Sequence, residues 1–315
     1  PTGTFGFGRG GTRTASITRV TGPPAPNMAA FSPNPDQLTS TGMRVRFSST
    51  GTGNSPIIEW QLQRARNNTF TTDASNHASS GTTVFTDMSP GQQWFFRARG
   101  RNAIGWGAWS GTSNATTLNV PGTPGPATVS NITATTADIT CVNPGSNGGA
   151  SISGREIQIS VVEDFSTVAF SHFSASLLYS KTGLTRNTQY YVRHRTQNAV
   201  GYGGWSPTTP FHTPGTPPTA PTGYVATNIA ATSAFVSLGS ISDNGGASPS
   251  QARVKVSTTA SDAGLVGTVT QPSWSPVQLT GLTKGTTYYV AQAAFNTALN
   301  GGWGPYGPWV SFSTR

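Results

Sequence analysis

Residues 190–198 of the chain read YYVRHRTQN, and this stretch decides the fold. Apolar and polar side chains alternate along it, which is the period of a strand with one buried face. The segments 137–142 and 155–161 alternate in the same way, and Asn-Gly-Gly turn sequences lie at 147–149 and 244–246. No window of about 12 residues has a helical period. The sequence therefore predicts an all-β protein.

This stretch is part of a repeat. The sequence NAIG at 102–105 recurs as NAVG at 198–201, and the same offset of 96 residues separates the Trp-Ser pairs at 109–110 and 205–206. A third copy has Asn296 after a further offset of 98 residues. Repetition at a fixed period indicates consecutive copies of one structural unit.

The repeat divides the chain into an extended N-terminal arm at 1–22 and three units at 23–120, 121–213 and 214–315. Several short strands in a unit of about 100 residues are typical of a β-sandwich. The second and third units each begin with the linker PGTP, and Pro-rich joints of this kind are typical of semi-rigid spacers. We therefore expect three tandem sandwiches.

The composition excludes several classes of protein. Charged residues make up 9% of the 315 residues, against about 25% in an ordinary soluble domain. The single Cys excludes a disulfide within the chain, and only ten acidic residues and four His are present, so we expect no catalytic site, metal or cofactor. The net charge is +9 without a run of five basic residues, which disfavours nucleic-acid binding. No apolar run reaches about 18 residues, so no membrane insertion is expected.

The units resemble fibronectin type III domains. In that family a Leu is followed six residues later by Tyr, then by alternating apolar positions, Asn-x-x-Gly and Ser. The second unit has these residues at Leu184, Tyr190, Val192, Asn198, Gly201 and Ser206. The resemblance covers about residues 25–315 and implies three fibronectin type III-like sandwiches.

The resemblance also implies a tyrosine corner, in which a Tyr hydroxyl bonds a nearby backbone group. Tyr190 and Tyr288 occupy that position in the second and third units, whereas the first unit has Trp94, which has no hydroxyl. The family's early core Trp is replaced as well. We expect Phe47, Cys141 and Leu238 in its place.

In two of the units, Arg residues lie two apart along a predicted strand and Trp or Tyr residues follow them. These Arg side chains share one face, because residues two apart on a strand point to the same side. One interpretation is a cation–π ladder, similar to that of cytokine receptor sandwiches with their Trp-Ser repeat. The other is an anion-binding face for a polyanionic wall polymer. We favour the ladder, but both interpretations apply to Arg97, Arg99, Arg101, Trp106, Trp109, Arg193, Arg195, Tyr202 and Trp205.

Three further features have two possible uses. His194 lies on the inward register, where a hydrogen-bonded core role is favoured over ligand binding, and Cys141 is expected to be a buried thiol. The aromatic cluster of Trp303, Tyr306 and Trp309 could stack on sugar rings, but packing in the core or in a ladder is favoured.

The N-terminal arm consists mostly of Gly, Thr and Arg and cannot form a core by itself. We expect it to dock into a partner through Phe5, Phe7, Arg9, Arg13 and Ile17. The start of the chain is not basic-then-apolar, so we expect no signal peptide.

Such an arm with tandem sandwiches resembles minor tail proteins of tailed phages of actinobacteria. The resemblance implies a virion structural protein, synthesised in the host cytoplasm, whose partners are other tail proteins, copies of itself and host-envelope glycan. The alternative is a secreted bacterial spacer or carbohydrate-binding module of a polysaccharide-active system.

Overall fold

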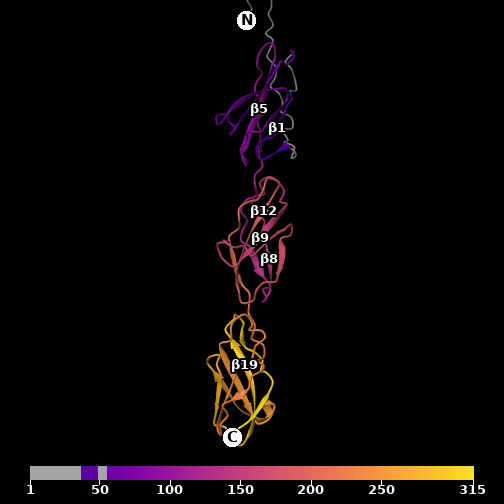
Figure 1. Cartoon of the computed structure of the whole chain (residues 1–315). Coiled ribbons are helices and arrows are strands. Elements are labelled where there is room, and N and C mark those ends of the chain that lie inside the picture. The colour runs from indigo at the N-terminus through magenta and orange to yellow at the C-terminus, as the bar shows by residue number, and fades with distance from the viewer. Residues whose placement is uncertain (1–36, 49–54) are drawn as a thin grey trace, which may run out of the picture. The chain divides into compact units, whose positions relative to one another are not determined.

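The computed structural model describes residues 37–48 and 55–315. These residues form β-sandwiches of antiparallel strands, and the predicted all-β class is confirmed. Figure 1 shows three groups of strands, each drawn from one stretch of the chain, around β5, β12 and β19. The predicted N-terminal arm lies outside the described residues, and so do Phe5, Phe7, Arg9, Arg13 and Ile17.

The first sandwich lies within 23–120 and packs a two-stranded sheet against a four-stranded sheet. Its core includes Leu62 and Phe96, which are fully buried. Each such side chain contributes about 1.5–3 kcal/mol on burial. The small sheet consists of β1 (Met43–Arg46) and β4 (Thr82–Phe85), and the large sheet has the order β3 (Ser75–Ser79), β2 (Glu59–Ala65), β5 (Gln93–Arg101) and β6 (Ser113–Thr116).

The second sandwich lies within 121–213, and its strand β12 contains the stretch that decides the fold. Buried and half-buried side chains alternate along β12 without a break. Ile139 and Ile157 fill the core between the sheets. One sheet has the order β10 (Phe170–Ser174), β9 (Gly154–Ser160), β12 (Gln189–Gln197) and β13 (Thr209–His212), and the other has the order β11 (Leu178–Thr182), β8 (Thr136–Thr140) and β7 (Thr128–Ser130).

The third sandwich lies within 214–315 and has a core of mostly Val and Leu, with Tyr224 fully enclosed. A short 3-10 turn, η2 (Asp262–Gly264), precedes its edge strand β17. One sheet has the order β14 (Ala226–Thr227), β15 (Ser233–Val236) and β18 (Val277–Thr280). The other has the order β17 (Leu265–Gln271), β16 (Gln251–Ser257), β19 (Thr287–Asn296) and β20 (Gly302–Trp303), with β21 (Val310–Ser313) also paired to β19.

The core positions expected to replace the family's Trp lie where the alternation predicts. Phe47 and Cys141 are buried, and Leu238 is partly buried against the third core. Different side chains therefore fill equivalent space in each sandwich.

The Asn of the repeated Asn-x-x-Gly motif is buried and holds the chain that leads into its sandwich. The Asn198 side-chain amide donates to the main-chain oxygens of Asn119 and Asn147, both at 2.8 Å. Its Oδ1 accepts from the Val200 N–H at 2.9 Å. One side chain thus ties together the incoming chain, the Asn-Gly-Gly turn and the turn after β12.

The same arrangement recurs in the third sandwich. The Asn296 amide donates to the main-chain oxygens of Thr216 at 2.9 Å and Asn244 at 2.5 Å. Gly245 has φ of +73°, and a Cβ there would lie 1.8 Å from the Thr216 oxygen. The close approach of the two chains therefore requires Gly in this turn.

Candidate functional site

The first sandwich carries a ladder of Arg side chains on β5 that stack on Trp rings. The Arg97 guanidinium lies 4.7 Å from the centre of the Trp109 ring, and that of Arg99 lies 4.3 Å from the same ring. Arg99 also lies 4.6 Å from Trp106, and Arg101 lies 5.9 Å from it. Each contact of this type contributes about 0.5–1 kcal/mol at an exposed site.

The neighbouring strand β2 fixes the ladder from the side. Arg97 donates its Nε–H to Gln63 at 2.7 Å, and Arg99 donates to Gln61 at 2.8 Å. Arg101 forms an ion pair with Glu59 at 3.2 Å, in which both side chains are about half exposed. The first two Arg side chains therefore bond neutral amides. Burial, and then the charge of Arg99, lowers the pKa of Arg97 below its ordinary value.

The second sandwich has a shorter ladder with a different charge balance. Arg193 and Arg195 lie 4.4 and 4.3 Å from the Trp205 ring. Arg193 donates to Gln158, but Arg195 donates to Glu156, at 2.7 Å from its Nη2. The side chain of Glu156 is only 17% exposed.

Burial raises the pKa of Glu156, but the hydrogen bonds from Arg195 and Ser171 outweigh it and hold that pKa below its ordinary value. The carboxylate therefore stays charged and compensates Arg195. Tyr202, the remaining aromatic residue predicted for this ladder, forms a β-bridge with Gln197 and is 37% exposed.

A Phe at the turn before each edge strand extends both ladders, and the sequence alone does not predict this contact. Arg97 lies 4.2 Å from the Phe70 ring, and Arg193 lies 4.1 Å from the Phe165 ring. Both Phe residues have positive φ, at 56° and 57°. A bulky residue at such a φ is uncommon. The two equivalent Phe residues could therefore be related to the ladders only from the backbone conformation, which the sequence does not reveal.

The third sandwich moves the cations to the neighbouring strand. Arg253 on β16 lies 3.9 Å from the Trp303 ring, and Lys255 lies 4.4 Å from the Tyr306 ring. The corresponding β19 positions opposite them are Ala293 and Ala291. Lys255 also pairs with Asp262 at 2.7 Å. Two members of the predicted aromatic cluster therefore stack against cations. Its third member, Trp309, is half-buried.

The two tyrosine corners have the backbone bond that the resemblance implies. The Tyr190 hydroxyl accepts from the Thr185 N–H at 2.9 Å, and the Tyr288 hydroxyl accepts from the Thr283 N–H at 2.9 Å. Trp94 differs: its Nε1 is buried without a partner among the described residues. The first sandwich therefore closes this end of its core in another way.

That other way is a partly buried ion pair. Arg64 donates two hydrogen bonds to Asp87, at 2.6 and 2.5 Å, and its guanidinium lies 4.9 Å from the Trp94 ring. The Arg64 side chain is 11% exposed and that of Asp87 is 63% exposed. The hydrogen bonds from Arg64 lower the pKa of Asp87 below its ordinary value.

His194 and Cys141 are enclosed in the second sandwich, as predicted. The Nε2 of His194 lies 3.2 Å from the Val142 main-chain oxygen, and burial lowers the pKa of the imidazole. Burial raises the pKa of the Cys141 thiol to about 11, so the thiol is protonated and is a poor nucleophile. In residues 37–48 and 55–315, no group of three His, Cys, Asp or Glu side chains could hold a metal ion.

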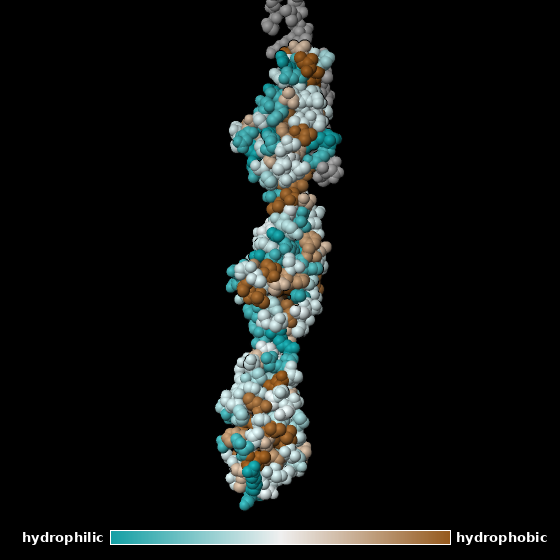
Figure 2. Space-filling view, viewed as in Figure 1, coloured by the Kyte–Doolittle hydropathy of each residue, from teal (hydrophilic) through white to brown (hydrophobic). Residues whose placement is uncertain are grey.

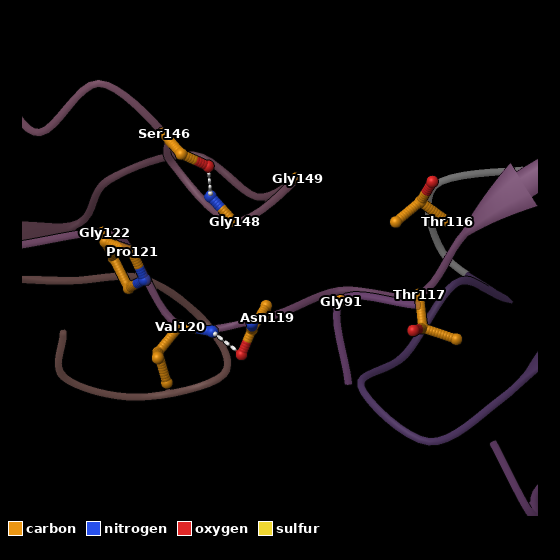
Figure 3. A pocket seen from close by; sticks show the side chains of 10 residues that line it. All are labelled: Gly91, Thr116, Thr117, Asn119, Val120, Pro121, Gly122, Ser146, Gly148 and Gly149. Carbon is orange, nitrogen blue, oxygen red and sulfur yellow. Dashed lines mark hydrogen bonds between the residues drawn. The ribbon is translucent and has the colours of Figure 1, made fainter. Parts of the chain in front are cut away.

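A cavity of about 380 Å³ lies beside the chain at 119–122 (Figure 3). Its lining is mostly Gly, Thr, Ser and Asn, and none of the residues labelled there has a titratable side chain. Hydrogen bonds within the lining, such as that from the Gly148 N–H to Ser146, satisfy its polar groups locally. The cavity therefore offers no acid, base or cation for chemistry.

The face of the molecule drawn in Figure 2 has small apolar patches. Figure 2 shows apolar side chains gathered in small, separate patches over each sandwich. No helix in the described part of the chain has the length and apolar character needed to cross a membrane.

Comparison with known proteins finds a family match in the first sandwich. The fibronectin type III domain family matches residues 33–116. The chain carries three tandem fibronectin type III-like sandwiches. The crystal structure of the FN1–FN3 domains of chicken CNTN1 aligns with a TM-score of 0.31 and 17% identity, covering 93% of this chain and 98% of that one.

Proposed function

We propose that the chain is a structural protein of a phage virion, a minor tail or tail-tip component that displays its three sandwiches toward the host surface. One observation supports the display role: the distinctive chemistry of each fibronectin type III-like sandwich is a half-exposed ladder of cations on aromatic rings. Four side chains of the kind that a reaction would need are committed to the core or to ion pairs. His194 and Cys141 are buried, and Asp87 and Glu156 pair with Arg.

The N-terminal arm supplies the anchor in this proposal. Its sequence alternates Phe with Gly at 5–8 and has few other apolar residues, so the proposed anchor is the insertion of these Phe side chains into a partner. The partners are other tail proteins and copies of this chain. Weak contacts of the displayed sandwiches with host-envelope glycan then add up through copy number.

Immunogold electron microscopy tests this proposal. An antibody against the third sandwich is applied to purified particles that carry the genome encoding this chain. Gold confined to the tails supports the proposal. Particles made from a genome in which residues 1–22 of this chain are deleted should have unlabelled tails, with the truncated protein free in solution. Unlabelled particles from the unaltered genome would refute the virion role.

The alternative is a secreted module that stacks on neutral sugar rings, and the ladders argue against it. Trp109 has guanidinium groups at 4.7 and 4.3 Å, and Trp205 has them at 4.4 and 4.3 Å. Rings that already pack on Arg offer less free face to a sugar. Retention of the chain on chitin or cellulose at high salt would favour this alternative.

A further inference from the structure

Two Arg side chains in the ladder of the first sandwich, Arg97 and Arg99, have no acidic partner among the described residues, whereas Arg101 pairs with Glu59. Arg97 and Arg99 donate their Nε–H groups to the neutral amides of Gln63 and Gln61. Among the described residues, no hydrogen-bond partner is found for the Nη atoms of either side chain. The second sandwich has Glu156 against Arg195.

The two guanidinium groups are held in place before any ligand arrives. Arg97 packs between Phe70 and Trp109, and Arg99 packs between Trp106 and Trp109. A planar guanidinium that is stacked on its faces and bonded at Nε keeps its Nη edge for a carboxylate or phosphate. Such preorganisation reduces the ordering cost of binding.

The spacing of the two groups selects the kind of ligand. Residues two apart on a strand lie about 6.6–6.8 Å apart. Arg97 and Arg99 therefore present two donor edges in a row, which a polymer with repeated anionic groups can bridge. Nucleic acids favour free aromatic faces on which bases stack, and here the indole rings already pack against guanidinium groups.

We infer that the Arg97–Arg99 face of the first sandwich binds an anionic polysaccharide through its carboxylate or phosphate groups. This inference deepens the proposed function and rests on its display role. It assigns the contact to one sandwich and to two Arg side chains. Coulomb attraction between exposed charges is screened by salt, so binding falls as ionic strength rises.

Binding of the full chain to polymer probes tests the inference. Polygalacturonate carries carboxylates, poly(glycerol phosphate) carries phosphates, and dextran is the neutral control. The decisive variant is Gln61→Glu with Gln63→Glu, because it retains the Arg side chains and adds the compensation that Glu156 provides in the second sandwich. We expect it to lose at least about tenfold in affinity for one or both anionic probes, at about 50 mM salt.

The matched control removes equal charge from the second ladder through Arg193→Gln with Arg195→Gln, and we expect a loss below about threefold. Circular dichroism melting verifies that each variant is folded. Unchanged affinity in the Glu variant, equal loss in the control, or equally tight binding of single-stranded oligo(dT) would overturn the inference. These measurements use isolated protein, so their failure leaves the immunogold result on the virion role unaffected.

Discussion

The first and second sandwiches close the same end of their cores with different chemistry. The second uses Ile159, Gly183 and the tyrosine corner of Tyr190. The first has Arg64, Asp87 and Trp94 at the equivalent positions. Asp87 and Trp94 correspond to Gly183 and Tyr190 through the offset of 96 residues. Arg64 corresponds to Ile159 because each follows a Gln, Gln63 or Gln158, that bonds an equivalent Arg of the ladder. Without a Tyr hydroxyl, the first sandwich ties its edge with an ion pair instead of a neutral hydrogen bond.

The exchange shows that these three positions act together. A Trp in place of Tyr leaves no bond to the backbone, but its ring provides a surface for the Arg64 guanidinium at 4.9 Å. Arg64 in turn requires an acceptor because it is 11% exposed, and Asp87 supplies two oxygens. Changing Asp87 alone would leave the enclosed Arg64 guanidinium without this carboxylate.

Asp87→Ala is expected to have the largest effect. It leaves the two Nη groups of the enclosed Arg64 without their carboxylate, while Nε still donates to Ser75. The expected loss in the free energy of unfolding is about 2 kcal/mol, because the exposure of Asp87 to solvent reduces the contribution of the pair. Hydrogen–deuterium exchange of peptides from β2 and β5 in the full chain measures the local free energy of unfolding. Gly183→Ala is not a matched control, since Gly183 has φ of +70°. Unchanged exchange in β2 would show that the pair is not structural.

Tyr190→Phe should have a smaller effect of about 1 kcal/mol, because it removes one neutral hydrogen bond and retains the ring. Exchange of peptides from β12 is the measurement. Tyr288→Phe repeats the test in the third sandwich and should give a similar loss. A loss at Tyr190 equal to that of Asp87→Ala would contradict the distinction between the two closures.

Arg193→Gln should cost about 1 kcal/mol, because it removes two cation–π contacts, on Phe165 and Trp205, that contribute about 0.5 kcal/mol each at a partly exposed site. The effect is confined to the second sandwich, so peptides from β5 serve as the internal control in the same exchange experiment. A loss several times larger would mean that the ladder holds the sandwich together.

His194→Gln should have the smallest effect at neutral pH. The third sandwich has Gln292 at this position, where it accepts from the Gly239 N–H at 2.8 Å and donates to the Ser237 oxygen at 3.1 Å. A lowered pKa of His194 means that its neutral form is favoured by folding. Stability is then fully present above the ordinary imidazole pKa of about 6.5 and falls as the pH decreases below it.

His194→Gln should therefore reduce the pH dependence of the local stability measured in peptides from β12. At pH 7.5 the hydrogen exchange of these peptides should be the same in the variant and the unaltered chain. This account would be contradicted if, in the unaltered chain, the free energy of local unfolding measured in β12 does not decline between about pH 6.5 and 5.

The sequence predicted the three sandwiches because their signals are local. Alternation along 190–198 and the repeated Asn-x-x-Gly motif each lie within one strand and its turn. The Arg rows on β5 and β12 were found for the same reason, since a period of two places Arg97 and Arg99 on one face.

What the sequence did not predict depends on pairing between distant strands. Arg64 and Asp87 are 23 residues apart and meet only across the sandwich. The cations of the third ladder were missed because β19 has Ala291 and Ala293 where the other units have Arg, and the cations lie on β16 opposite them. The Gln partners that leave Arg97 and Arg99 without a compensating carboxylate also became visible only through the β2–β5 register.

The substitution Glu156→Gln tests the central claim most directly, because it gives the second ladder the neutral partners of the first. Gln retains an acceptor for Arg195, so the stack on Trp205 is preserved. Titration of the full chain with the anionic probe that the first ladder binds should show tighter binding for this variant, by about threefold or more. Equal affinity of the variant and the unaltered chain would contradict the claim that carboxylate compensation decides which ladder binds anions.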